Sequence, residues 1–168
     1  MRVLGLDPGL AITGYGLVEG DGQRLVALEH GVIRTPAGAP RSQRLVLLHD
    51  ELSALLARYN PDVAAVEELF LDTNARTAMS VGEARGVLLL TLAQAGVSVA
   101  EYTPMQVKQA VTGYGGAGKQ QVQQMIALLL NLAEIPRPDD AADALAISVC
   151  YLHSMRWDAL LNPGGDER

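Results

Sequence analysis

The chain has 168 residues, 49% of them apolar, and a formal net charge of −6. This length and composition suffice for one domain with a sizeable core, and the acidic balance disfavours a general binder of polyanions. There is no apolar run of about eighteen residues, so we expect no membrane span. The N-terminus lacks the pattern of a secretory signal. The single cysteine, Cys150, cannot form an internal disulfide, and its apolar neighbours indicate a buried thiol. We therefore expect a cytoplasmic protein.

The first sixteen residues, MRVLGLDPGLAITGYG, combine a short apolar run with a turn. The run from Val3 to Leu6 predicts a buried strand that Asp7-Pro8-Gly9 closes. Asp7 would then lie at the end of a core strand, where a desolvated carboxylate needs a cation or hydrogen-bond donors. Alternatively, Asp7 forms an Asx turn ahead of Pro8. This stretch alone leaves both interpretations open.

Two further strands are expected over residues 13–18 and 24–33, joined by Gly-rich turns into an antiparallel meander. A helix capped by Ser42 should follow and run to Tyr59, with leucines along one face. Asn60-Pro61 is a stop signal for this helix.

The apolar run Val63–Val66 follows that helix and predicts a buried parallel strand, with Glu67 and Glu68 at its carboxyl end. A long helix is expected next, over residues 75–95. Small residues share one of its faces: Ala78, Gly82 and Gly86. Because glycine inside a helix costs about 1 kcal/mol relative to alanine, this stripe indicates close approach of another helix, in the same domain or in a second subunit.

The rest of the chain predicts one more strand and three helices. The strand covers residues 97–102; the helices cover 103–113, beginning with a Thr103 cap and Pro104, 119–130 and 139–155. The glycine-rich segment 113–118 is too flexible to adopt a fixed conformation without other contacts. We expect a single α/β domain over residues 1–156, with a mixed sheet flanked by helices, and a flexible C-terminal tail over 157–168.

Carboxylates occur at three places on the expected edge of the core. Asp140 and Asp143 share one face near the start of the last helix, and Asp7 and Glu67 end two strands. Asp139 or Asp140 could instead be an N-cap, but Asp143 lies where the helix should begin to bury. Four oxygen ligands with few histidines suit Mg²⁺ or Mn²⁺, and two such ions about 3.5–4 Å apart would promote phosphodiester displacement.

Five segments of the chain resemble the RuvC Holliday junction resolvases, which have the ribonuclease H-like fold. They are LGLDPGLAITGYG, VEELF, AMSVGEARGVLL, MQVKQAVTGYGGAGKQQVQ and DDAADALAI, in the order of that family. The resemblance implies a homodimeric endonuclease that nicks four-way DNA junctions symmetrically during recombination and repair. It also implies two Mg²⁺ ions per active site, which Mn²⁺ can replace, and the branch-migration proteins RuvA and RuvB as partners.

The resemblance also implies roles for single residues. Catalysis and metal binding fall to Asp7, Glu67, Asp140 and Asp143, and DNA binding to Phe70, Arg76, Lys108 and Lys119. Phe70 would stack on junction bases, although a core position is its ordinary alternative, and the lysines could equally be solvated surface. Glu68 departs from the family pattern, and we interpret it as solvated. Between residues 73 and 119, four basic side chains outnumber two acidic ones, which leaves room for a local DNA surface.

Two other functions fit parts of this pattern. Actin-like ATPases also end their first strand in an acid and a Gly-rich turn, but 168 residues leave no room for the second lobe they need. The alternative that stays open is a ribonuclease H-like relative that binds nucleic acid or processes RNA without junction specificity. The small-residue stripe distinguishes a junction resolvase from such a relative, because a resolvase needs a two-fold dimer to present two sites.

Overall fold

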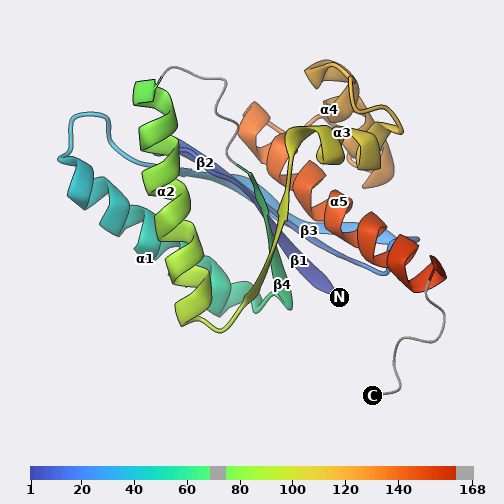
Figure 1. Ribbon diagram of the computed structural model, residues 1–168, viewed down its shortest axis with the longest axis horizontal. Helices are drawn as coiled ribbons and strands as arrows, with labels where there is room; N and C mark the ends of the chain where they lie inside the picture. The colour runs from blue at the N-terminus through green and yellow to red at the C-terminus, as the bar shows by residue number, and fades with distance from the viewer. Residues whose placement is uncertain (69–74, 162–168) are drawn as a thin grey trace.

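The computed structural model describes residues 1–68 and 75–161, without the side chains of 75, 76 and 158–160. Within these residues a five-stranded sheet lies between two layers of helices (Figure 1). The strands are β1 (Arg2–Asp7), β2 (Ile12–Gly20), β3 (Leu25–Arg34), β4 (Val63–Glu67) and β5 (Ser98–Tyr102). The helices are α1 (Arg41–Tyr59), α2 (Ala75–Gln94), α3 (Pro104–Thr112), α4 (Lys119–Leu129) and α5 (Asp139–Leu161).

The sheet is mixed, as the sequence predicts, with the strand order β3-β2-β1-β4-β5. β1, β2 and β3 form the expected antiparallel meander, with an irregularity in the β2–β3 register at Leu17/Val18. β4 joins β1 in parallel and β5 joins β4 in parallel. The apolar run in β4 therefore lies inside the sheet, covered on both faces, which is why it contains only apolar side chains.

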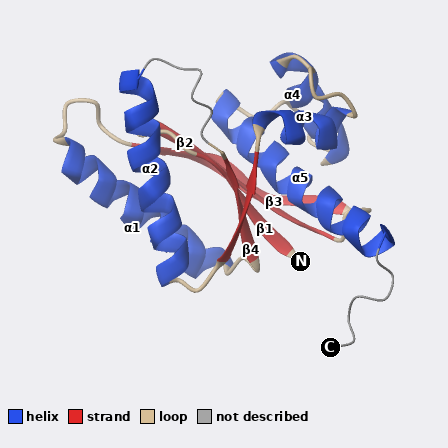
Figure 2. Cartoon of the chain, in the orientation of Figure 1, coloured by secondary structure: helices blue, strands red, loops and turns tan. Residues whose placement is uncertain are grey.

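Two hydrophobic cores lie on opposite faces of the sheet. Figure 2 shows the two layers of helices, one on each face, that cover them. On one face α1 and α2 pack against Leu4 and Leu6 of β1. On the other face α3, α4 and α5 pack against Val3 of β1 and Val18 of β2. The alternation of β1 side chains between the two faces follows from the two-residue period of a strand.

Glycines on β1 and β2 let α5 approach the sheet at backbone distance. A methyl group at Gly5 would overlap the carbonyl oxygen of Ala144, and one at Gly14 would overlap the carbonyl oxygen of Asp140. The hydroxyl of the fully buried Ser148 also donates to the carbonyl of Gly16 at 2.8 Å. The start of α5 is therefore fixed directly above the end of β1 and the start of β2.

Several predicted helix ends are confirmed. Thr103 forms a capping box with Gln106, Pro104 is the first residue of α3, and Gly113 ends it in the left-handed conformation. Asn60 ends α1 in the same conformation.

The predicted Ser42 cap is wrong. α1 begins at Arg41 and its N-cap is Pro40, which makes no side-chain hydrogen bond. The ring of Pro40 holds its backbone extended (φ −53°, ψ 141°), so the helix begins directly after it and Ser42 already lies inside.

The last helix is longer than predicted. α5 continues to Leu161 rather than ending near Met155, so residues 157–161 of the expected tail are helical. The chain meets no glycine or proline between Asp139 and Pro163, and its alanines and leucines favour helix. Residues 162–168 lie outside the described part. Among the described residues, no helix combines the length and the apolarity needed to cross a membrane.

Cys150 of α5 lies in the core beneath α3, with 1% of its surface exposed. Its thiol lies 3.7 Å from the carbonyl oxygen of Gln106, to which it donates. Burial raises the pKa of the Cys150 thiol to about 12. The sequence interpretation of a buried, unpaired thiol is confirmed.

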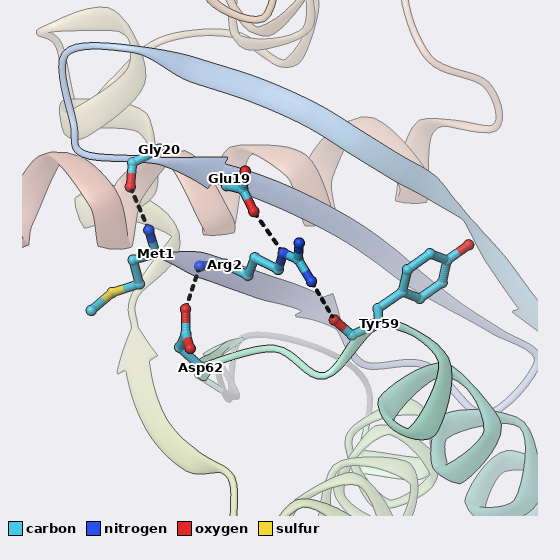
Figure 3. A network of polar contacts seen from close by, with 6 residues as sticks. All are labelled: Met1, Arg2, Glu19, Gly20, Tyr59 and Asp62. Carbon is cyan, nitrogen blue, oxygen red and sulfur yellow. Dashed lines mark hydrogen bonds and ion pairs between the residues drawn. The ribbon is translucent and has the colours of Figure 1, made fainter.

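Polar contacts of Arg2 fix the amino end of β1 (Figure 3). Its backbone amide donates to Asp62 at 2.7 Å, and its guanidinium pairs with Glu19 at 2.6 Å and reaches the carbonyl of Tyr59 at 3.4 Å. The Met1 ammonium donates to the carbonyl of Gly20 at 3.2 Å. These exposed contacts are individually weak, but together they join β1, β2 and the α1–β4 connection at the end of the sheet away from Asp7.

We expect Gly14→Ala to destabilise the protein by about 1–3 kcal/mol, because the added methyl must push α5 off the sheet. Urea denaturation followed by circular dichroism measures this change. Gly38→Ala is the matched control, since a methyl there meets nothing within 4 Å. Equal stability of the two variants would contradict the close packing described above.

Candidate active site

Two of the predicted acids are brought together by the parallel pairing of β1 with β4. Leu6 is paired with Val66, so Asp7 and Glu67 are the next residues of adjacent strands and lie at the same edge of the sheet. Carboxyl ends of parallel strands are where functional groups gather in α/β proteins. Asp7 and Glu67 are therefore neighbours at the end of two paired strands.

The other two acids come from the start of α5. Asp140 and Asp143 lie in its first turns, and the close contact of the Asp140 carbonyl with Gly14 places that turn over the end of β1. Gly14 is the register partner of Asp7. Backbone packing thus carries the α5 pair to the carboxylates at the strand ends.

The charges of these acids act on one another. Burial, followed by the charges of Glu67, Asp143 and Asp140, raises the pKa of Asp7 to about 8. Burial is also the main cause that raises the pKa values of Glu67 and Asp143, and the Asp143 charge adds to the effect on Glu67. The structure therefore concentrates four carboxylates in a partly desolvated place, which favours a cation there.

The turn after β1 is closed by Thr13. Its fully buried hydroxyl donates to the carbonyl of Gly9 at 2.7 Å and lies 3.4 Å from the Gly9 amide, which donates to it. The Asx-turn interpretation of Asp7 is thus unnecessary for the turn, and the Asp7 carboxyl is left to face the other acids.

Among the described residues, Lys119 is the one basic side chain that forms an ion pair with any of these four acids. Its ammonium, at the first position of α4, lies 3.0 Å from Oδ2 of Asp143 and 3.6 Å from Oδ2 of Asp139. The other carboxylate oxygen of Asp139 accepts a hydrogen bond from Arg137 at 2.8 Å. From the sequence we expected Lys119 to bind DNA and left either Asp139 or Asp140 as a possible N-cap. The pairing of Lys119 with Asp139 was not predicted, because it joins two helices that only the tertiary structure brings together.

Comparison with known proteins shows the family of the chain. The family model "Crossover junction endodeoxyribonuclease RuvC" matches residues 3–151. A protein of that name from Heliobacterium modesticaldum is 57% identical over 157 residues, which is 94% of this chain and 97% of the relative. The chain belongs to the RuvC family.

Solved structures of other proteins have the same architecture. RuvC of T. thermophilus, in complex with Holliday junction substrate, is 38% identical and superposes with a TM-score of 0.90, covering 94% of this chain and 96% of that one. The yeast mitochondrial Holliday junction resolvase, at 17% identity and a TM-score of 0.65 over 96% of this chain and 82% of its own, shares the fold. The expected ribonuclease H-like fold is thereby confirmed.

The four residues assigned to DNA in the RuvC resemblance are placed unequally. Phe70 lies outside the described residues, and Arg76 lies in α2 with its side chain outside the described part. Lys108 lies on α3, and its charge lowers the pKa of Glu67 against the larger effect of burial. Glu68 is exposed, in line with the solvated interpretation, and its backbone amide donates to the carbonyl of Tyr102 at 2.9 Å.

The donor set of the cluster fits a divalent cation in its chemistry. It consists of carboxylate oxygens, which Mg²⁺ and Mn²⁺ prefer. In the described part of the chain, however, no three His, Cys, Asp or Glu side chains are arranged to hold one ion. Asp143 is instead engaged by Lys119. The residues fit a divalent cation by type, and they come together at one edge of the sheet.

Asp7→Asn should change how stability depends on pH. The unfolded chain releases the Asp7 proton near its ordinary pKa of 3.8, whereas the folded chain keeps it to about 8, so stability falls as pH rises between these values. Asparagine mimics the neutral acid, so without metal Asp7→Asn should lose less stability than the wild type as pH rises. Above pH 8 its free energy of unfolding should be about 1–3 kcal/mol higher than that of the wild type.

Urea denaturation at several pH values in chelator measures this difference. Asp50→Asn, at an exposed position of α1, is the control and should follow the wild type. The same pH slope in the wild type and Asp7→Asn would show that the Asp7 carboxyl is not buried among like charges.

Proposed function

We propose that this protein resolves four-way DNA junctions by metal-dependent, symmetric hydrolysis of phosphodiesters in recombination and repair. The observation that carries the proposal is the convergence of Asp7, Glu67, Asp140 and Asp143 at one edge of the sheet in a RuvC-family chain. The related T. thermophilus protein was solved with a Holliday junction substrate. The RNA-processing alternative has no comparable support.

The proposed division of labour follows from how each acid is held. Asp7 and Glu67 extend from paired strands in the middle of the sheet, so their positions are rigid. Asp140 and Asp143 belong to α5, which packs on one face of the sheet and whose backbone contacts the glycines of β1 and β2. Two Mg²⁺ ions, or Mn²⁺ in their place, would activate the attacking water and stabilise the departing 3′ oxygen when bound. These four carboxylates are the proposed ligands.

Two lysines are proposed to contact the DNA backbone beside this site. Lys119 borders Asp143 directly, and the charge of Lys108 reaches Glu67. In a chain of net charge −6, these lysines offset the local negative potential that would otherwise repel a phosphate. Phe70 and Arg76 keep their proposed DNA roles from the family resemblance alone.

We further propose a homodimer formed through α2. A methyl at Gly86 would meet nothing within 4 Å, so the small-residue stripe has no partner helix there among the described residues. Met79 and Leu90, on the same side of α2, are 63% and 57% exposed. A two-fold axis along this face would give two sites for two opposing strands. RuvA and RuvB as partners stay an expectation from the family resemblance, and a cytoplasmic location stays an expectation from the sequence.

The cleavage proposal predicts paired symmetric nicks in an end-labelled synthetic four-way junction with Mg²⁺ or Mn²⁺, and none in linear duplex or in chelator. Asp7→Asn should lower the nicking rate at least about 100-fold, because loss of a residue that only supports the metal ligands already costs about 10- to 100-fold. Junction binding, measured by gel shift, should be unchanged. Asp50→Asn is the control. Binding without cleavage under any metal would contradict the proposal.

The dimer proposal predicts that Gly86→Leu weakens self-association, because the bulky side chain separates the two α2 helices. The same change at Gly82 should have the same effect. Light scattering across a concentration series measures it, with Gly38→Leu as a control at another open glycine. Since a Cβ at Gly86 meets no atom of the described residues within 4 Å, circular dichroism should show unchanged folding. An unaltered dimer in both α2 variants would move the interface elsewhere.

A further inference from the structure

Lys119 contacts two aspartates, and a bound metal would compete with the lysine for only one of them. Asp143 belongs to the proposed metal set, whereas Asp139 does not. Lys119 Nζ lies 3.0 Å from Oδ2 of Asp143 and 3.6 Å from Oδ2 of Asp139, so one ammonium spans both carboxylates. A divalent cation ligated by Asp143 would compete for the same oxygen and repel the ammonium.

Asp139 is built to keep the ammonium nearby. Arg137 donates to its Oδ1 at 2.8 Å, which leaves Oδ2 directed toward Lys119. Lys119 is the first residue of α4, and the buried Ala117 and Val122 fix the backbone on both sides of it. The ammonium therefore lies within 4 Å of both carboxylates, Asp143 and Asp139, from one fixed backbone position.

We propose that Lys119 is the internal counterion of Asp143 in the metal-free site, and that a divalent cation displaces it onto Asp139. Asp139 is a positioning residue that acts through Lys119, and it holds the displaced ammonium beside the acids, where a DNA phosphate would arrive. This inference rests on the proposed metal set and adds a residue that the assignment of catalytic acids does not contain.

The test measures Mn²⁺ binding to the full-length, DNA-free protein by the paramagnetic resonance signal of free Mn²⁺. Lys119→Met removes the competitor, so Mn²⁺ should bind about two- to five-fold more tightly, the equivalent of one partly exposed ion pair. Lys108→Met is the matched control. It also removes one positive charge near the acids, but Lys108 forms no ion pair within the described residues. Its effect should therefore be clearly smaller.

Asp139→Asn tests whether Asp139 affects Mn²⁺ binding by positioning Lys119 or only by its own negative charge. If Asp139 acts through Lys119, Asp139→Asn should weaken Mn²⁺ binding in the wild type and have no effect in the Lys119→Met background. An effect of equal size in both backgrounds would show that Asp139 contributes only its charge, and would overturn its positioning role.

The remaining outcomes distinguish this inference from the proposed function. Unchanged or weaker Mn²⁺ binding by Lys119→Met, or equal tightening by Lys108→Met, would overturn the counterion exchange while leaving the metal site intact. Asp7→Asn should lose Mn²⁺ binding. If Asp7→Asn binds Mn²⁺ as the wild type does, or the wild type binds none, the proposed metal set fails and this inference fails with it.

Discussion

The contact of α5 with the glycines of β1 and β2 is the constraint on which the rest of the structure depends. A helix ordinarily packs on a sheet through side chains, which can adjust to one another. Here the carbonyls of Ala144 and Asp140 meet the sheet where Gly5 and Gly14 lack a Cβ. The distance between α5 and β1 is therefore set by backbone atoms, and the placement of Asp140 and Asp143 relative to Asp7 is set with it.

This fixed placement of the acids causes electrostatic repulsion among their carboxylates. Holding carboxylates close together at the edge of the core raises the pKa values of Asp7, Glu67 and Asp143. The fold tolerates the repulsion because stability comes from two cores elsewhere, one on each face of the sheet. Lys119 offsets part of this negative charge through its ion pair with Asp143. Stability and the concentration of negative charge thus oppose each other at these side chains.

Much of the fold follows from local sequence signals. Turn residues and apolar runs predicted the strands, and Thr103-Pro104 predicted the start of α3, because these signals act within a few residues. The start of α1 was misplaced because a serine suggested a cap that Pro40 makes unnecessary. The convergence of Asp7 with Glu67 was predictable from parallel strand ends. The pairing of Lys119 with Asp139 was not, because it depends on how α4 and α5 pack.

The burial of Cys150 has a practical consequence for experiments on this molecule. Thiol reagents attack the thiolate, and a thiol with a pKa of about 12 in the core is almost never in that form or within reach. Since Cys150 is the only cysteine, the native chain already behaves as a cysteine-free background. A single cysteine introduced at an exposed position would therefore carry a spin label or fluorophore selectively, without any prior substitution in the core.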